Sequence, residues 1–232
     1  MEQISKLYEV RFSENEKLMK DKVWRELCEQ FFQKYISNED TLFEIACGFG
    51  EFSRHIRAGK KLAVDMNPAV KNILPKEIEF HLGSAESFPQ IASASIDVCF
   101  TSNFFEHLMN KQAMDNVLKE VLRVLKPGGK FIMMQPNIKY AYGAYWDFYD
   151  HHLPLSHLSA AEGLQKCGYQ IQEVIPKFVP FSTKSAFPKH PLLIRLYLKL
   201  PFIWKVLGKQ FVIVAQKPKA SLTNIQSATA VI

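Results

Sequence analysis

The chain has 232 residues and a formal net charge of +6, and 47% of its residues are hydrophobic. This composition predicts a soluble globular chain of one domain or two, which excludes the disordered and fibrous classes. Residues 1–30 hold no apolar secretory signal, and the four cysteines lack CxxC or metal-ligand spacing, so we expect a cytoplasmic protein without disulfides or zinc.

The first predicted element is a helix over residues 14–36. Leu18, Val23, Leu27 and Phe31 recur there at roughly helical intervals among lysine, glutamate and glutamine residues. This apolar stripe predicts a helix that packs against the remainder of the chain.

Residues 42–65 hold the pattern around which the chain is organised. An apolar run from Leu42 to Ala46 predicts a buried strand, and the two glycines of the next four residues predict a tight turn. A short helix should follow from Glu51, and a second apolar run ends in Asp65. A strand, glycine turn, helix, strand and acid in this order predict a nucleoside site at the carboxyl edge of a parallel sheet.

Two nucleoside ligands fit such a site. A dinucleotide needs GxGxxG for its pyrophosphate, but Ser53 stands where the third small residue belongs and Glu51 would add negative charge. The stretch LFEIACGFG instead resembles motif I of the class I S-adenosylmethionine (SAM)-dependent methyltransferases, a hydrophobic strand followed by an acid and spaced glycines. The resemblance implies SAM as the co-substrate.

The resemblance also implies a role for each residue of the motif. Glu44 would lie near the methionine amino group, the glycines would lie under the ligand, and Asp65 would accept hydrogen bonds from the ribose. Ala46 replaces the first glycine of the pattern. A helix before the first strand often covers the cofactor in this family, so residues 14–36 form either such a cover or a packing helix. The implied cofactor residues in this region are Glu44, Ala46, Gly48, Gly50, Asp65 and Met66.

A short helix after Asp65 and a strand over residues 77–82 lead to a second cofactor loop. The sequence GSAESFP that follows resembles the adenine-binding loop of the family. Ser84 stands where an aspartate often accepts from the adenine amino group, and a hydroxyl can accept there too. Ala85, followed by Glu86, matches the small residue whose backbone amide meets the adenine ring.

Residues 95–101 predict a fourth strand, and SNFFEHL follows it. This stretch resembles the segment after the fourth strand in small-molecule members of the family. Because the carboxyl end of that strand faces the sulfonium, Asn103 is a candidate for contact with the transferred methyl group. His107 is interpreted either as a hydrogen-bonded structural residue or as a proton acceptor.

Residues 111–125 form the clearest amphipathic helix of the sequence. The following KPGGK predicts a turn into a fifth strand at residues 131–134. The string LxxVLKPGGxF is a highly recurrent signature of this methyltransferase class, and it marks the fold rather than a site. The resemblance therefore covers residues 40–135.

Residues 137–157 are rich in tyrosine and also hold His151, His152 and His157. In the family this segment commonly forms part of the acceptor site, and aromatic side chains suit an apolar or ring-shaped acceptor; the alternative is a surface-packing segment. A hydroxyl acceptor would need a neutral histidine as base, so we hypothesise His151, then His152, then His107. The histidine spacing also suggests a metal site, but no cysteine lies near these histidines, so we expect no metal there.

Residues 159–166 predict a helix with Ser159 as its N-cap and Glu162 completing a capping box. A sixth strand should follow directly, and the seventh is expected at residues 210–216. An insertion at about 181–208 separates these two strands, and its proline at position 201 should divide an apolar stretch into two short helices.

Residues 174–232 contain nine lysine or arginine residues and no acidic residue, so the positive charge is regional. The basic, aromatic segment at 190–207 is too short and too charged to span a bilayer, and its pattern fits two interpretations, of which contact with an anionic membrane surface is one. A lid or a dimer contact is the alternative. Because no RNA-binding module is recognisable, the sequence speaks against nucleic acid as a partner.

Together these patterns predict an α/β protein with a doubly wound, mostly parallel seven-stranded sheet and helices on both faces. We expect an N-terminal helical cap at 1–39, a methyltransferase domain at 40–217 and a disordered tail at 218–232. The predicted function is methyl transfer from SAM to a small-molecule, glycan or lipid-linked acceptor, with oxygen as the favoured atom. A non-catalytic SAM-binding protein and an RNA methyltransferase are the alternatives.

Overall fold

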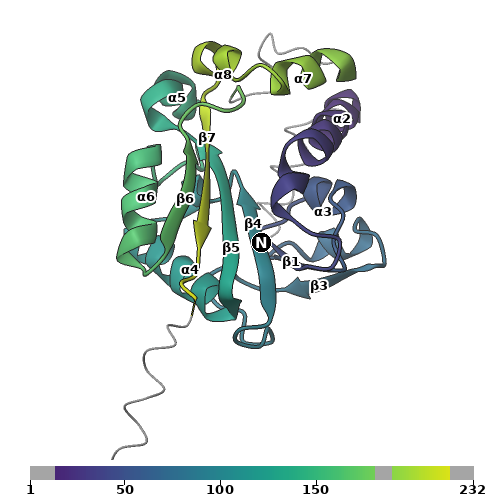
Figure 1. Cartoon of the computed structure of the whole chain (residues 1–232), viewed down its shortest axis with the longest axis vertical. Helices are drawn as coiled ribbons and strands as arrows, with labels where there is room; N and C mark the ends of the chain where they lie inside the picture. Colours follow the sequence, from purple (N-terminus) through teal and green to yellow (C-terminus); the bar gives the residue numbers. More distant parts are fainter. Residues whose placement is uncertain (1–13, 181–189, 220–232) are drawn as a thin grey trace, which may run out of the picture.

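A computed structural model describes residues 14–180 and 190–219. Seven strands form one sheet in the order β3-β2-β1-β4-β5-β7-β6 (Figure 1). The strand order reverses between β1 and β4, and in such sheets ligands bind outside the carboxyl ends of the strands at this point. The bounds are β1 Thr41–Ile45, β2 Lys60–Asp65, β3 Ile78–Leu82, β4 Ile96–Ser102, β5 Leu125–Pro136, β6 Gln170–Ile175 and β7 Gln210–Gln216.

The sheet is mostly parallel, as predicted, and a single antiparallel strand makes it mixed. Strands β1 to β5 pair parallel with one another, whereas β7 lies antiparallel between β5 and β6. Pro136, at the carboxyl end of β5, lies opposite Gln210, where β7 begins. The chain also leaves β6 at the carboxyl edge of the sheet, and the segment that follows stays at that edge. β7 therefore starts at the carboxyl edge and runs antiparallel to β5 and β6.

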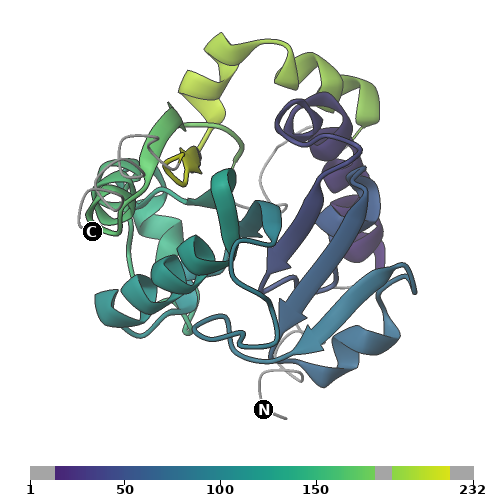
Figure 2. The same cartoon turned by 60° about the horizontal axis from the view of Figure 1, so that its bottom comes forward.

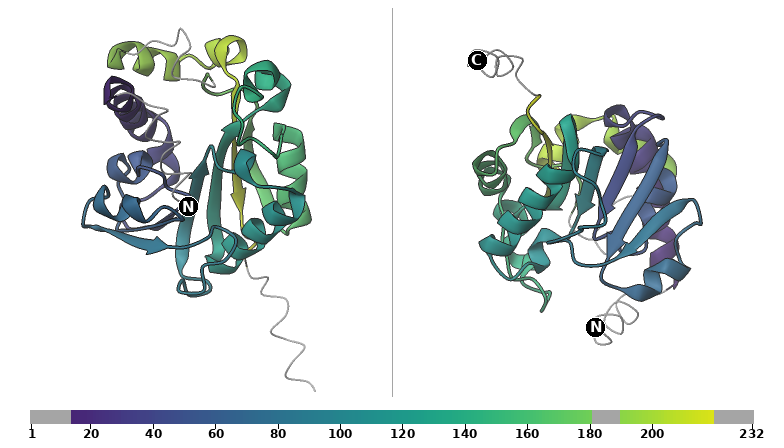
Figure 3. Two further views of the ribbon diagram at one scale, coloured as in Figure 1. Left: turned by 180° about the vertical axis from the view of Figure 1, so that it is seen from behind. Right: turned by 90° about the horizontal axis from the view of Figure 1, so that it is seen from below.

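Helices cover both faces of the sheet (Figures 2 and 3). Helices α4 and α6 pack on one face, and α2, α3, α7 and α8 pack on the other. On β5, Phe131 and Met133 belong to the first core and Ile132 and Met134 to the second, so the strand is buried on both sides. The bounds are α2 Glu14–Gln30, η1 Phe32–Tyr35, α3 Glu51–His55, η2 Pro68–Asn72, η3 Phe105–His107, α4 Lys111–Val124, α5 Ile138–Tyr145, α6 His157–Lys166, α7 Pro191–Leu198 and α8 Pro201–Leu207.

Two helix boundaries differ from the sequence expectation for local reasons. The helix expected at 14–36 ends at Gln30 and continues as the short 3₁₀ helix η1. Helix α6 begins at His157, two residues earlier than expected, because its N-cap is Ser156 and Ser159 supplies the reciprocal bond of the capping box. Glu162 therefore takes no part in that cap.

The segment between β6 and β7 contains α7 and α8, separated at Pro201 as predicted. Helix α7 is tied to α2 by Arg195, whose Nε lies 2.6 Å from Oε2 of the buried Glu26. Residues 181–189 of the expected insertion, and most of the expected tail at 218–232, lie outside the described residues. Within the described ranges, none of the helices has the length and apolar character needed to span a membrane.

Candidate cofactor and acceptor site

The loop between β1 and α3 is built from backbone in the left-handed region. Gly48 and Gly50 have φ of 53° and 69°, and Ala46 has φ of 52° although it carries a Cβ atom. A Cβ atom at Gly50 would lie 2.0 Å from Cδ2 of Leu74, whereas a Cβ atom at Gly48 would meet nothing within 4 Å. The loop is thus closely packed at Gly50 and open at Gly48.

Glu44 lies beneath this loop and is only 5% exposed. Its Oε2 accepts hydrogen bonds from the backbone N of Ser53, at 3.1 Å, and from the Ser53 hydroxyl. Ser53 is in the first turn of α3, so the carboxyl group satisfies one of the backbone N–H groups that the helix leaves unpaired. Burial raises the pKa of Glu44 to about 8, and the hydrogen bonds from Ser53 oppose that rise.

Asp65, at the carboxyl end of β2, connects three loops. Its Oδ2 accepts from Gly48 N at 2.8 Å and its Oδ1 accepts from Asn67 N at 2.9 Å. Its backbone carbonyl accepts from Gly83 N at 3.0 Å, which ties down the loop after β3. Burial raises the pKa of Asp65, and backbone hydrogen bonds, including those from Asn67 and Gly48, counteract this rise. The next residue, Met66, is exposed.

The loop after β3 is stabilised by its own side chains. The Ser84 hydroxyl accepts from Glu86 N at 3.1 Å, which closes a local turn, and the Glu86 carboxylate accepts from Asn116. Ala85 is buried in the core beneath them. Asn103, after β4, is exposed with φ of 47°, and its N donates to the Met134 carbonyl. The predicted cofactor residues therefore lie at the carboxyl ends of β1, β2, β3 and β4.

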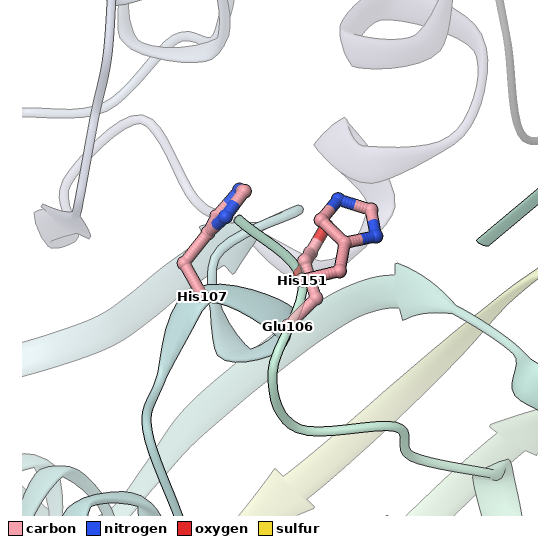
Figure 4. Close-up of side chains that lie close together, drawn as sticks. All are labelled: Glu106, His107 and His151. Atoms are coloured by element: carbon pink, nitrogen blue, oxygen red, sulfur yellow. The ribbon is translucent and has the colours of Figure 1, made fainter. Parts of the chain in front are cut away.

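Beyond β4, the structure brings together Glu106, His107 and His151 (Figure 4). One ligand atom from each lies within 4.8 Å of those of the other two. The contact forms because the backbone N groups of His152 and Leu153 both donate to the Glu106 carbonyl, at 2.7 and 3.2 Å. Glu106 is 3% exposed, and burial raises its pKa to about 8.

The other histidines of the aromatic segment lie elsewhere. His152 is exposed, and His157 is buried, with its Nδ1 2.9 Å from Nδ2 of Asn137. The pairing of His107 with His151 was not expected, nor was the involvement of Glu106. The EHL triplet resembles a helix start, but an acid between apolar residues and a histidine is also a signal for a buried polar site.

The aromatic segment after β5 forms α5 and the turns that follow it. Tyr145 is fully buried, and its hydroxyl donates to the Leu153 carbonyl at 2.8 Å. The His151 ring stacks on Phe148 at 4.8 Å between ring centroids. Other aromatic side chains of this segment are exposed, namely Tyr142, Trp146 and Tyr149.

Comparisons with known proteins identify the family of the central region. Residues 43–133 match a family model described as a methyltransferase domain. The chain is 27% identical over 173 residues to an uncharacterised methyltransferase-like protein of Schizosaccharomyces pombe, across 72% of this chain and 59% of the relative. It is 36% identical over 106 residues to a thiol S-methyltransferase of Rattus norvegicus, across 41% of this chain and 42% of the relative.

A solved structure shares the fold. A SAM-dependent methyltransferase from Archaeoglobus fulgidus superposes with a TM-score of 0.62 at 17% identity, over 84% of this chain and 93% of that chain. The chain spans about half the length of the curated relatives described above. The likeness thus concerns a shared domain.

Proposed function

Because this chain contains a class I SAM-dependent methyltransferase domain, we propose that it transfers a methyl group from SAM to a small-molecule or lipid-linked acceptor. The observation that carries this proposal is Asp65, which accepts from Gly48 and Asn67 at the end of β2. An acid held there between glycine turns suits the two hydroxyls of a ribose.

Each predicted cofactor residue receives a role in this proposal. Asp65 would accept from the ribose, with Met66 beside it, and the open side of Gly48 would allow the ligand to approach the backbone. Glu44 would stay close to the positively charged methionine amino group. The remaining contacts would come from Ala46, Gly50, Ser84, Ala85, Glu86 and Asn103.

The reaction would be a direct displacement. A lone pair of the acceptor atom attacks the methyl carbon, the carbon–sulfur bond breaks, and S-adenosylhomocysteine leaves as a neutral thioether. The sulfonium is already a good leaving group, so the protein mainly aligns the acceptor and takes up its proton. We assign this proton to the cluster of Glu106, His107 and His151, with His151 as the first candidate base, His107 beside it and the exposed His152 as the third.

The acceptor atom is proposed as oxygen, with sulfur as the second candidate. Sulfur is included because the chain is similar to the rat thiol S-methyltransferase. A thiol ionises more readily than an alcohol, so the two acceptors would depend differently on the base.

We further propose that the acceptor is met at a membrane surface. Helices α7 and α8 expose Leu192, Leu196, Phe202 and Val206, and the chain from residue 174 onward has no acidic residue. In this proposal these helices belong to an insertion at about 181–208 within a methyltransferase domain at 40–217. Residues 1–39 would form the N-terminal cap, of which α2 and η1 are the described part.

The cofactor assignment is tested by binding of S-adenosylhomocysteine, measured by calorimetry. Asp65→Ala should weaken binding at least about tenfold, since it removes the proposed ribose contact. The control is Asp115→Ala, because Asp115 lies on α4 and pairs with Lys166. Equal affinity of wild type and Asp65→Ala would refute the cofactor site.

The acceptor class is tested by incubation with methyl-labelled SAM and cell extract, followed by separation of lipid, nucleic-acid and small-molecule fractions. Label in the lipid or small-molecule fraction supports the proposal. Label in RNA would establish the RNA methyltransferase alternative. Binding of SAM with no label in any fraction would favour a non-catalytic SAM-binding protein.

A further inference from the structure

The cluster of Glu106, His107 and His151 combines two imidazoles and one carboxyl group in a small volume (Figure 4). It differs from the histidine set that the sequence raised and rejected as a metal site, since His152 and His157 lie outside it. Two imidazoles and a carboxylate are preferred ligands of divalent first-row transition metals.

Glu106 is the residue that most needs a partner in this cluster. Glu106 is only 3% exposed, and its Oε2 has no hydrogen-bond partner among the described residues. An ionised carboxylate in such surroundings is strongly unfavourable unless a positive charge compensates it. A bound cation would supply that charge and occupy the unsatisfied oxygen.

His107 already has the outer contact that metal-binding histidines usually make. Its Nδ1 lies 3.0 Å from the Asp150 carbonyl and 3.3 Å from the Asp150 carboxylate. A proton on Nδ1, donated to these oxygens, leaves Nε2 with the lone pair that a cation would take. The His151 ring is held in place by its stacking on Phe148 and its contact with Tyr145.

We propose that Glu106, His107 and His151 bind a divalent transition-metal cation, with Zn²⁺ as the reference ion. Zinc ligands at about 2.1 Å lie about 3.4 Å apart, so donor atoms now within 4.8 Å would close by at most about 1.4 Å. Three protein ligands leave a fourth position open. That position would hold the acceptor oxygen or sulfur and lower its pKa, and this role rests on the proposed function. With the cation bound, His151 would act as a ligand instead of as the base.

The test is a titration of the full, tag-free chain with Zn²⁺ after removal of metal by a chelator, followed by Co²⁺ substitution. We expect one equivalent of Zn²⁺, an increase in Tm on binding, and a visible absorption band of tetrahedral Co²⁺. Glu106→Gln and His107→Ala should each weaken Zn²⁺ binding at least about tenfold. His152→Ala is the matched control, since it removes an exposed histidine next to the cluster and should leave binding unchanged.

Glu106→Gln is expected to fold, because it replaces a buried carboxyl group by a neutral group of the same shape. Its Tm without metal should equal or exceed that of the wild type, while the Zn²⁺-dependent rise in Tm should disappear. No Zn²⁺ or Co²⁺ binding by the wild type, or equal binding by wild type and Glu106→Gln, would overturn the proposal.

Metal binding is measured without SAM, so the proposed cation site and the proposed methyltransferase function can be refuted independently. Methyl transfer by a chain that binds neither ion would overturn the cation site and leave His151 as the candidate base. Zinc binding by a chain that does not bind SAM would overturn the proposed function and uphold the cation site.

Discussion

Glu44 shows, at the scale of a single residue, how burial of an acid in the proposed cofactor site affects stability. Burial raises its pKa from 4.5 to about 8, so between these pH values the folded chain holds a proton that the unfolded chain has released. The stabilising contribution of protonated Glu44 is therefore complete below about pH 4.5 and is lost as the pH rises toward 8.

We expect the free energy of unfolding of the wild type to fall between about pH 5 and 8, by at most about 1.4 kcal/mol per pH unit for Glu44. Glu44→Gln should remove this part of the slope, as measured by urea unfolding at several pH values. Glu120→Gln is the control, since Arg123 lowers the pKa of Glu120 and its contribution changes only at more acidic pH. A slope unchanged by Glu44→Gln would contradict the buried, protonated state.

Ala46 is strained because it carries a Cβ atom at φ of 52°. The left-handed conformation costs a residue with a Cβ atom about 1–2 kcal/mol, and glycine at this position would avoid that cost. Glycine also has more conformational freedom in the unfolded chain, which offsets part of this gain in stability. Ala46→Gly should therefore raise the free energy of unfolding by about 0.5–1 kcal/mol. Ala69→Gly, in the exposed part of η2, should lower it instead.

At the scale of the element, the β1–α3 loop contains one closely packed glycine, Gly50, and one open glycine, Gly48. Gly50→Ala would place a Cβ atom 2.0 Å from Leu74 Cδ2, at a positive φ. It should cost about 2 kcal/mol or more of stability, measured by chemical unfolding. Leu74→Ala should recover part of this loss in the double variant, because it removes the clashing atom.

Gly48→Ala should behave differently, since a Cβ atom there meets nothing within 4 Å. We expect a stability loss of about 1–2 kcal/mol, from conformation alone. Affinity for S-adenosylhomocysteine should fall at least about tenfold, because the added methyl group occupies the side from which the cofactor is proposed to approach. Full affinity in Gly48→Ala would place the cofactor elsewhere.

At the scale of the whole molecule, α7 and α8 combine one buried side with one apolar exposed side. Ile194, Tyr197, Leu198 and Trp204 pack into the core shared with α2. The outer side exposes Leu192, Leu196, Phe202 and Val206 by 53–76%. Aromatic and aliphatic groups beside lysine and arginine are typical of a segment that lies in the membrane interface.

We expect the full chain to sediment with vesicles of phosphatidylserine and phosphatidylcholine, and to sediment less as salt increases. Replacing Leu192, Leu196, Phe202 and Val206 by serine should abolish sedimentation and leave Tm and S-adenosylhomocysteine affinity nearly unchanged. Leu158→Ser, at an exposed leucine on α6, is the matched control. Equal sedimentation of the wild type and the fourfold variant would show that the outer side of α7 and α8 is not a membrane contact.

Local patterns in the sequence were sufficient for most strands and for the loops that follow them. The exception is β5, Leu125–Pro136, which includes residues 126–130, where the sequence predicted a turn. The bounds of β7 agree with the predicted range of 210–216, and the helix predicted at 111–125 is α4, Lys111–Val124. Apolar alternation, glycine turns and helix-ending signals act over a few residues, so they can be recognised in the sequence. The resemblance at 40–135 rests on the same kind of short-range signal.

The direction of β7 and the composition of the histidine cluster were decided only by the tertiary structure. β7 runs back because the segment carrying α7 and α8 stays at one edge of the sheet. His151 reaches Glu106 because His152 and Leu153 donate to the Glu106 carbonyl. The sequence by itself determined a methyltransferase fold and the glycine loops of the proposed cofactor site. The proposed acceptor site depends on contacts between distant segments, which leave no periodic signal in either segment.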